Sequence, residues 1–598
     1  MNPNDHKSVM IKSALFESAL VLIALLLSLG LFFSRFPLLF SNIFDVIPIS
    51  FIHKGEGPFW PIITSDPLQL VYLTWAAGNG LSEGRSLLSD PHQFANLVER
   101  FYPIVTDPIV YLGGFFSLFS SLAFAYNIAF IIFPHIAFSL FTYMTLRILK
   151  VGKGLAFGFA ILTPLIPFRL YLLFQAQHIG ASAFLLPIYF WGIALFFLHP
   201  TARITGSFIV GLTLLLMGIS EEHLAYSAAF FFWPFLILYF VSIKPVSWSK
   251  SHIIISLKKL IHETWPILIS ILFFVLWGYL QFKLLTDLAI SKRFSLDDHG
   301  NPDFEIIIRN SVDFSFWFKE PFGFTSVLLF FLLLGCCISI FRILRKKASF
   351  VDHFILATSF VFWICSLLSI GHIPWLAEHF HWHPYQCLFK HMPFFNFQRF
   401  PQRMSFVGFM SGLIVASYGF HCLLNYLFSK RPLYYQLSSI FAALLLFFTA
   451  QQWVYRLGEG QYYSFAKDPY PEIHQIIRST AGNQEIVLRL PARTAATFED
   501  TRTLLNIIYT DAHFFNGYFS HVPKTYAENF SLFTPKMCDD GNLTDELINA
   551  IKKVGIRYFL IDREFIDIDS EGMRKLVQDP RITTLLKTSE FLYLKVNL

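Results

Sequence analysis

Long apolar stretches alternate with short polar loops over about the first 450 residues of the chain. Each stretch is close to the roughly 20 residues that an α-helix needs to cross a bilayer. They lie at approximately 14–33, 125–146, 154–173, 180–198, 204–220, 224–243, 265–284, 323–341, 353–371, 404–427 and 434–452. The pattern predicts a polytopic α-helical membrane protein with about eleven transmembrane helices.

The basic residues of the connecting loops follow one register. Every second loop is basic, and these loops together carry Lys7, Lys12, Arg147, Lys150, Lys153, Arg203, Lys244, Lys250, Lys258, Lys259, Arg342, Arg345, Lys346, Lys347, Lys430 and Arg431. The same loops hold only three acidic residues, Asp5, Glu263 and Asp352. Because cytoplasmic loops are enriched in Lys and Arg, we expect a cytoplasmic N-terminus and a C-terminal domain outside.

One apolar segment, Ile109 to Ala123, does not fit the series. It is short for a full crossing and contains the pair Gly113-Gly114. Counting it as a span would place the basic cluster Arg342 to Lys347 outside the cytoplasm. We therefore interpret the segment as an interfacial or re-entrant helix.

Composition agrees with a membrane protein, since 55% of the residues are hydrophobic, 14% are charged and 72 are phenylalanine. No run of Lys and Arg is long enough to suggest nucleic-acid binding. The six cysteines show no metal-ligand spacing, so we expect neither a zinc site nor a disulfide framework. The apolar stretch Leu15 to Phe33 lacks a cleavage site, and we expect a retained signal anchor.

The chain divides into two predicted regions. Residues 1–452 form the transmembrane domain, in which 34–108 is a long first outside loop, and residues 453–598 form a small α/β domain outside the cytoplasm. For the second region we predict a helix at Glu472–Ser479, a buried strand at Glu485–Pro491, an amphipathic helix at Leu543–Val554 and a strand at Gly555–Asp562.

Two aspartates in the first outside loop are candidate catalytic residues. Asp66 precedes Pro67 at a predicted helix start, with Leu68, Val71, Tyr72 and Trp75 on one face of that helix. It either caps the helix or serves as a general base for an acceptor hydroxyl. Asp107, in Thr106-Asp-Pro108, has the same two interpretations.

Further polar groups fall on the outside in this topology. Glu221-Glu222-His223 links two spans, and it is either a solvated turn or part of a site for an acceptor or a divalent cation. His178 is either a residue of the same site or an interfacial histidine. Two adjacent carboxylates are an incomplete ligand set for a cation. The sequence therefore leaves the cofactor unknown, with a divalent cation as one candidate. Arg169 either snorkels to the interface or binds phosphate.

Arg399 and Arg403 lie at the outside mouth of the tenth span, against the general charge trend. Guanidinium groups bind phosphate in bidentate fashion, which suits the headgroup of an anionic lipid. The same loop contains five histidines without metal-site spacing, and we expect them to line the site rather than bind metal: His372, His379, His381, His383 and His391.

Short motifs recur in order along the chain: Ser65-Asp-Pro-Leu-Gln69 with Trp75, Phe101-Tyr-Pro103, Ala125-Tyr-Asn127, Gln177-His178 with Leu186-Pro187, Arg399-Phe-Pro-Gln-Arg403, and His513-Phe-Phe-Asn-Gly-Tyr518 with Ser520 and Pro523. Through this order the chain resembles bacterial members of the GT-C superfamily, which are integral-membrane glycosyltransferases with lipid-linked sugar donors. The resemblance implies that Asp66 is the catalytic base and that the donor is a polyprenyl-phosphate or polyprenyl-diphosphate sugar, delivered at the outer face of a bacterial cytoplasmic membrane.

The expected enzyme transfers a hexosyl or pentosyl group to a glycan, lipid or protein acceptor, with Arg399, Arg403 and Arg169 on the donor phosphate. Two other classes remain open at this point. A transporter or flippase for a lipid-linked glycan would place charged residues near the bilayer midplane. A non-catalytic assembly protein would use the outside domain to bind partners.

Overall fold

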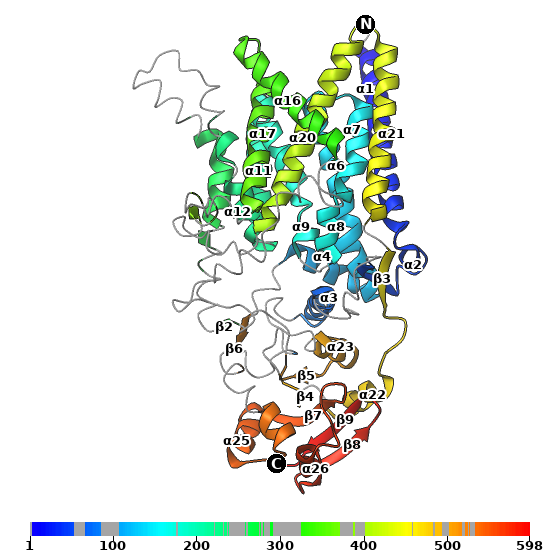
Figure 1. Ribbon diagram of the computed structural model, residues 1–598, viewed down its shortest axis with the longest axis vertical. Coiled ribbons are helices and arrows are strands. Elements are labelled where there is room, and N and C mark those ends of the chain that lie inside the picture. Colours follow the sequence, from blue (N-terminus) through cyan, green and yellow to red (C-terminus); the bar gives the residue numbers. More distant parts are fainter. Residues whose placement is uncertain are drawn as a thin grey trace.

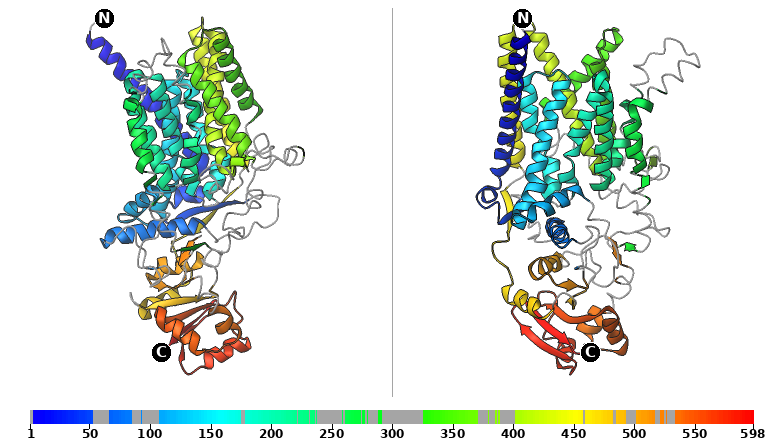
Figure 2. Two further views of the ribbon diagram at one scale, coloured as in Figure 1. Left: turned by 90° about the vertical axis from the view of Figure 1, so that its left-hand side faces the viewer. Right: turned by 180° about the vertical axis from the view of Figure 1, so that it is seen from behind.

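The computed structural model shows a helical bundle joined to a small α/β domain (Figure 1). It describes residues 3–52, 66–84, 92, 107–174, 178–220, 222–230, 232–235, 237, 258, 261–273, 275–276, 279, 288–290, 325–370, 379, 385, 387–388, 401–456, 459–481, 485–492, 501–516, 521–523, 526 and 533–598. The N-terminus lies at the far end of the bundle from the C-terminal domain (Figures 1 and 2).

Within the described residues, nine helices are long and apolar enough to cross a membrane. They cover Leu15–Phe33, Leu122–Ile148, Lys153–Leu170, Gly180–Leu198, Pro200–Ser220, Ser326–Leu344, Phe350–Ser369, Pro401–Phe428 and Pro432–Tyr455. Two further predicted spans, 224–243 and 265–284, lie only partly in the described residues, where the pieces Leu224–Phe235 and Ile261–Phe273 are apolar helix. The prediction of a polytopic helical membrane protein is confirmed.

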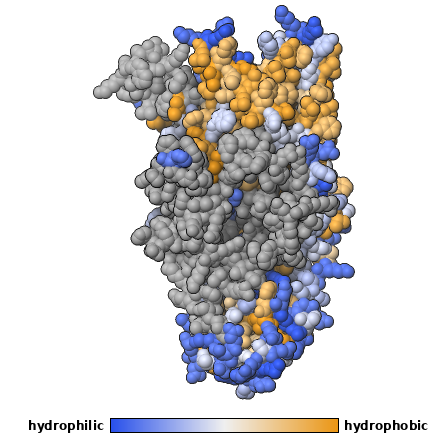
Figure 3. Space-filling model, viewed as in Figure 1, coloured by the Kyte–Doolittle hydropathy of each residue, from blue (hydrophilic) through white to orange (hydrophobic). Residues whose placement is uncertain are grey.

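The elements of this bundle follow the chain closely. They are α1 (Pro3–Phe33), α2 (Pro37–Ser41), α5 (Leu122–Tyr126), η2 (Asn127–Ile132), α6 (Phe133–Ile148), α7 (Lys153–Leu162), η3 (Thr163–Leu165), α8 (Pro167–Phe174), α9 (His178–Ser182), α10 (Leu185–Leu198), η4 (Pro200–Ala202), α11 (Arg203–Ser220), α12 (Glu222–Phe230), α16 (Ser326–Leu344), α17 (Phe350–Ser369), η7 (Pro401–Met404), α20 (Ser405–Phe428) and α21 (Pro432–Arg456). On the face shown in Figure 3, the described surface of the upper part of the molecule is mostly hydrophobic.

Described basic loops gather at the N-terminal end of the bundle, where ion pairs tie neighbouring helices together. Glu17 of α1 lies 2.9 Å from the Lys153 ammonium and 3.4 Å from Arg147 Nε. On the other side of the bundle Asp352, which is buried, accepts hydrogen bonds from Arg342 at 3.1 Å and from the Tyr418 hydroxyl at 2.9 Å. The described basic loops thus lie at one end of the bundle, as the alternation of basic loops in the sequence predicts.

Residues far apart in the chain pair at the opposite end. Strand β1 (Val46–Ile52) runs antiparallel to β3 (Glu459–Ser464), with Val46 opposite Ser464 and Ile52 opposite Glu459. Strand β1 follows the first span and β3 follows the last, so an even number of crossings must separate them. Of the eleven predicted spans, ten lie between β1 and β3, which is an even number. If residues 109–123 also crossed the membrane, the number would be odd and the two strands would lie on opposite sides.

The C-terminal domain is built on a five-stranded sheet of order β5-β4-β7-β9-β8. Strands β4, β5 and β7 are parallel, while β9 is antiparallel to β7 and β8. The elements are α22 (Pro471–Thr480), β4 (Ile486–Leu490), α23 (Thr501–Thr510), β5 (His513–Phe514), β6 (His521–Pro523), η9 (Pro535–Asp539), α25 (Asp545–Val554), β7 (Ile556–Asp562), α26 (Glu571–Gln578), β8 (Ile582–Lys587) and β9 (Phe591–Val596). All four elements predicted for this domain are confirmed. Strand β6 pairs instead with β2 (Leu288–Ile290) from a membrane-domain loop.

Candidate functional site

The end of the bundle where β1, β3 and the C-terminal domain lie, called here the domain-side end, carries the helix starts of several candidate residues that the structure describes. Several of them stand at or near the first residue of a helix. Asp66 begins α3 (Asp66–Ser82), His178 begins α9, Glu222 begins α12, and Asp107 immediately precedes α4 (Pro108–Ser117). The side chains of Asp66, His178, Glu222 and His223 lie outside the described residues, as do Glu221 and Arg399 altogether.

Helix α3 lies across the end of the bundle, between it and the C-terminal domain (Figures 1 and 2). Its apolar side chains are buried almost all round: Leu68, Leu70, Val71, Tyr72 and Leu73 are each at most 2% exposed. The sequence prediction of a single buried face toward the membrane was therefore incomplete. The second face is covered because α3 also packs against α23 of the C-terminal domain.

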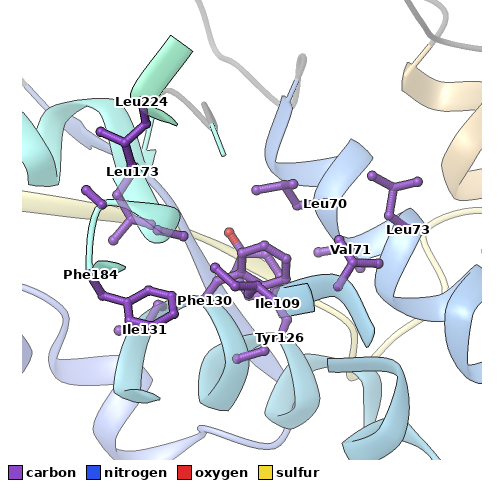
Figure 4. Close-up of a cluster of buried hydrophobic side chains, with 14 of the residues drawn as sticks. Leu70, Val71, Leu73, Ile109, Tyr126, Phe130, Ile131, Leu173, Phe184 and Leu224 are labelled. Atoms are coloured by element: carbon purple, nitrogen blue, oxygen red, sulfur yellow. The ribbon is translucent and has the colours of Figure 1, made fainter. Parts of the chain in front are cut away.

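One apolar cluster joins the helices that carry the candidate residues (Figure 4). Leu70 and Val71 of α3 lie beside Ile109 of α4. The same cluster includes Tyr126 of α5, residues of η2, α8 and α12, and the residue that precedes α10, namely Phe130, Ile131, Leu173, Leu224 and Phe184. Close packing of this kind fixes the helix starts relative to one another. The backbone positions of Asp66, Asp107 and Glu222 are thus set by a shared core.

The pair Gly113-Gly114 has a packing role in this arrangement. A Cβ at Gly113 would lie 2.9 Å from Cγ2 of Thr74, and one at Gly114 would lie 2.7 Å from Cβ of Ala77. Both distances are too short for a side chain, so the two glycines let α4 lie directly against α3. At about 15 Å for ten residues, α4 is also too short to cross the bilayer. The prediction of a non-spanning helix here agrees with the structure.

Asp107 is the N-cap of α4. Its carboxylate accepts a hydrogen bond of 2.9 Å from the backbone N–H of Ile109, and its side chain is buried. Two interpretations were given for Asp107, a helix cap and a general base. The hydrogen bond to Ile109 is the contact expected of a helix cap.

Arg169 is fully buried within the helix bundle, so it does not snorkel to the interface. Its Nη1 donates to the carbonyl oxygen of Pro164 at 2.5 Å, and its guanidinium lies 4.6 Å from the ring centre of Phe138. In the described part of the chain its Nε and Nη2 atoms have no hydrogen-bond partner, and the same holds for Nε2 of the buried His135. A buried charge of this kind inside a membrane domain is costly and marks a candidate functional residue.

Arg403 lies half-buried in η7, at the start of α20. The η7 turn packs against α12, the helix that begins with Glu222-His223. Helix α9, which begins with His178, packs against α8 and α11. The elements bearing Arg403 and the Glu-Glu-His turn are therefore neighbours. Among the residues that the structure describes, no three His, Cys, Asp or Glu side chains are grouped closely enough to hold a metal ion.

Sequence reasoning missed the junction between the first loop and the C-terminal domain. Asp511 Oδ1 accepts a hydrogen bond from Asn79 Nδ2 at 3.1 Å and lies 3.1 Å from Nε2 of His92. The His92 ring makes edge contacts with Trp75, at 4.9 Å between centroids, and with His513, at 5.2 Å. The first loop and the segment beginning at His513 were both noted in the sequence, but no local signal indicated that they touch.

Comparison with solved structures identifies the architecture. The mycobacterial arabinofuranosyltransferase AftD superposes with a TM-score of 0.54 over 98% of this chain and 40% of AftD, at 10% identity. A mutant form of AftD gives 0.55 over 98% and 41%, also at 10% identity. The chain has the GT-C fold. It spans about two fifths of AftD, so the GT-C core of this protein corresponds to part of that longer chain.

A second GT-C protein, the oligosaccharyltransferase of Archaeoglobus fulgidus, gives a TM-score of 0.49 at 13% identity, over 92% of this chain and 70% of the archaeal one. No protein-family model matches the sequence, and no curated protein sequence matches it significantly. The GT-C fold is therefore identified by the structural superposition on AftD, and not by overall sequence similarity.

Proposed function

We propose that this protein is a membrane glycosyltransferase with Asp66 as its general base. It transfers a sugar from a polyprenyl-phosphate or polyprenyl-diphosphate donor to an acceptor hydroxyl at the outer face of a bacterial cytoplasmic membrane. The observation that carries the proposal is the position of Asp66 as the first residue of α3, which is fixed on the domain-side end of a GT-C bundle by a shared apolar core.

The reaction is a direct displacement at the anomeric carbon. The acceptor oxygen forms the new bond to that carbon while the bond from the carbon to the donor phosphate oxygen breaks. The Asp66 carboxylate takes the acceptor proton, and the electron pair of the broken bond leaves with the phosphate. The sugar therefore inverts its anomeric configuration.

The developing phosphate charge needs cationic or dipolar partners, and the domain-side end of the bundle supplies both. Arg403 lies in η7 beside α12, and Arg399 is four residues earlier in the chain. Helices α4, α12 and α20 all begin at this end, so their positive dipole ends point toward it. We assign the donor phosphate to Arg399 and Arg403. Arg169 would join them only through its unpartnered Nε and Nη2 atoms.

Acceptor recognition is assigned to Glu221, Glu222, His223 and His178. The helices α9 and α12 that begin at two of these residues both contact α11, so the groups belong to one face of the bundle. Asp107 is assigned to the helix cap described above. The basic loops at the N-terminal end of the bundle support a cytoplasmic location for that end and an outer location for the site.

The test is a transfer assay on the purified full-length protein in liposomes, with radiolabelled polyprenyl-phosphate pentoses and hexoses and a glycan acceptor. Asp66→Asn is expected to lower the transfer rate by about 10²-fold or more, since a general base contributes roughly 10² to 10⁴. Asp45→Asn is the matched control, because Asp45 lies in the same loop and is exposed.

Two results would count against the proposal. Full transfer by Asp66→Asn would remove the base assignment. A wild-type protein that moves labelled donor across the liposome membrane but transfers no sugar would replace the enzyme with a lipid-glycan transporter.

A further inference from the structure

Asp511 breaks two local preferences of the chain at once. It follows the last residue of α23 with a φ of 59°, which is the left-handed conformation that favours glycine, and its N–H bonds to the carbonyl of Ile507 as a helix C-cap does. Its carboxylate also sits at a helix C-terminus, where the helix dipole disfavours negative charge. A glycine would suit this position better on both counts.

The Asp511 side chain is 52% exposed, and two partners of its carboxylate come from the first loop of the membrane domain. One carboxylate oxygen of Asp511 accepts from Asn79 of α3 and lies in hydrogen-bond range of His92. His92 is only 4% exposed, and its backbone carbonyl accepts a 2.7 Å hydrogen bond from the N–H of Phe514 in β5. Among the residues that the structure describes, contacts at this junction bring together three titratable groups, Asp511, His92 and His513.

We propose that Asp511 is a positioning residue for the catalytic base. Through Asp511 the C-terminal domain would hold α3, and with it Asp66, in the position that transfer requires. This inference rests on the proposed function of Asp66. Asn79 lies thirteen residues from Asp66 along α3, a distance of about 20 Å in a helix. Loss of the Asn79 contact would free α3 to tilt about its packed segment near Val71, which is five residues or about 8 Å from Asp66. A tilt of about 8° about that point would shift Asp66 by roughly 1 Å, and an error of about 1 Å in a reacting group costs up to ~10²-fold in rate.

The informative variant is Asp511→Gly, since glycine keeps the left-handed backbone while removing the carboxylate. We expect kcat to fall by about 10-fold or more, with KM for the lipid-linked donor unchanged and the thermal unfolding temperature equal or higher. Asp511→Asn keeps the acceptor oxygen and is expected to restore at least about half of kcat. Asp540→Gly is the control, because Asp540 is an exposed aspartate of the same domain.

Hydrogen–deuterium exchange supplies a readout that does not depend on transfer. In Asp511→Gly the amides of α3 should exchange faster, while those of β7 and β9 keep the wild-type rate. The positioning role is wrong if the α3 amides of Asp511→Gly exchange at the wild-type rate. It is also wrong if they exchange faster while kcat stays at the wild-type value. If the wild-type protein transfers no sugar at all, the proposed function fails, and the exchange data alone then decide whether Asp511 holds α3.

Discussion

Arg489 and Asp562 form a salt bridge between neighbouring parallel strands, with 2.6 Å between Nη2 and Oδ2 and each side chain 1% exposed. Arg502 of α23 adds a second contact to the same carboxylate at 3.2 Å. The sheet and the helix that covers α3 are therefore linked through one buried acid.

Removal of this acid should strongly destabilise the C-terminal domain. Asp562→Ala would remove the carboxylate that pairs with the buried Arg489 at 2.6 Å, and loss of one partner of a buried ion pair costs about 3–5 kcal/mol. Urea unfolding of the full-length protein, followed by hydrogen exchange in β4 and β7, measures the loss. Glu571→Ala is the control, since its pair with Lys575 is exposed and should leave the unfolding free energy nearly unchanged. Equal effects of the two variants would contradict the prediction.

Asp107 offers a way to separate a helix cap from a catalytic acid. Asp107→Asn keeps a good N-cap and should retain wild-type stability and transfer, whereas Asp107→Ala should lose about 1 kcal/mol of stability. Thermal unfolding and the transfer assay are measured on both variants. If Asp107→Asn kept the wild-type stability but lost transfer activity, Asp107 would return to the catalytic candidates.

The contact between α16 and α20 depends on two glycines. A Cβ at Gly419 would press against the carbonyl oxygen of Phe331, and one at Gly335 would lie 2.7 Å from the carbonyl oxygen of Val415. Gly419→Leu should therefore force these helices apart at a cost of about 1–3 kcal/mol. Gly30→Ala is the matched control, because a Cβ there meets nothing within 4 Å. The thermal unfolding temperature in detergent should fall for the first variant and stay level or rise for the second.

The ion pair of Asp579 should contribute to the loss of stability of the C-terminal domain at low pH. Hydrogen bonds from Arg581, at 2.6 and 2.9 Å, lower the pKa of this carboxyl from 3.8. A carboxyl with a lowered folded-state pKa stabilises the fold above its unfolded pKa, and this contribution is lost as the pH falls through the lowered value. Asp579→Asn should therefore remove part of the drop in stability below about pH 4. Identical acid profiles for variant and wild type would show that the Asp579 carboxyl contributes nothing to this sensitivity.

Local patterns were sufficient for much of the fold. The spans, the basic-loop register and the elements of the C-terminal domain are short-range features, and Gly555 with Thr544 marks the two ends of α25 as expected from helix capping. The non-spanning helix α4 also followed from its length.

The second buried face of α3 could not be predicted in this way. It exists because α23, more than 400 residues later in the chain, packs against α3. The hydrogen bond from Asn79 to Asp511 belongs to this contact. Nothing near Asn79 in the sequence differs from an ordinary solvated helix end. For Arg169 the sequence left both snorkelling and phosphate binding open. The burial that excludes snorkelling comes from tertiary packing, with Phe138 and Pro164 beside the guanidinium.

The pairing of β1 with β3 also constrains the order of assembly during synthesis. Ile52 emerges from the ribosome early, but its partner Glu459 is made only after the last span has been synthesised. Strand β1 therefore cannot pair with β3 until some 400 further residues have been made. The β1–β3 ladder forms only after the whole bundle between the two strands has been synthesised, so it closes late in assembly.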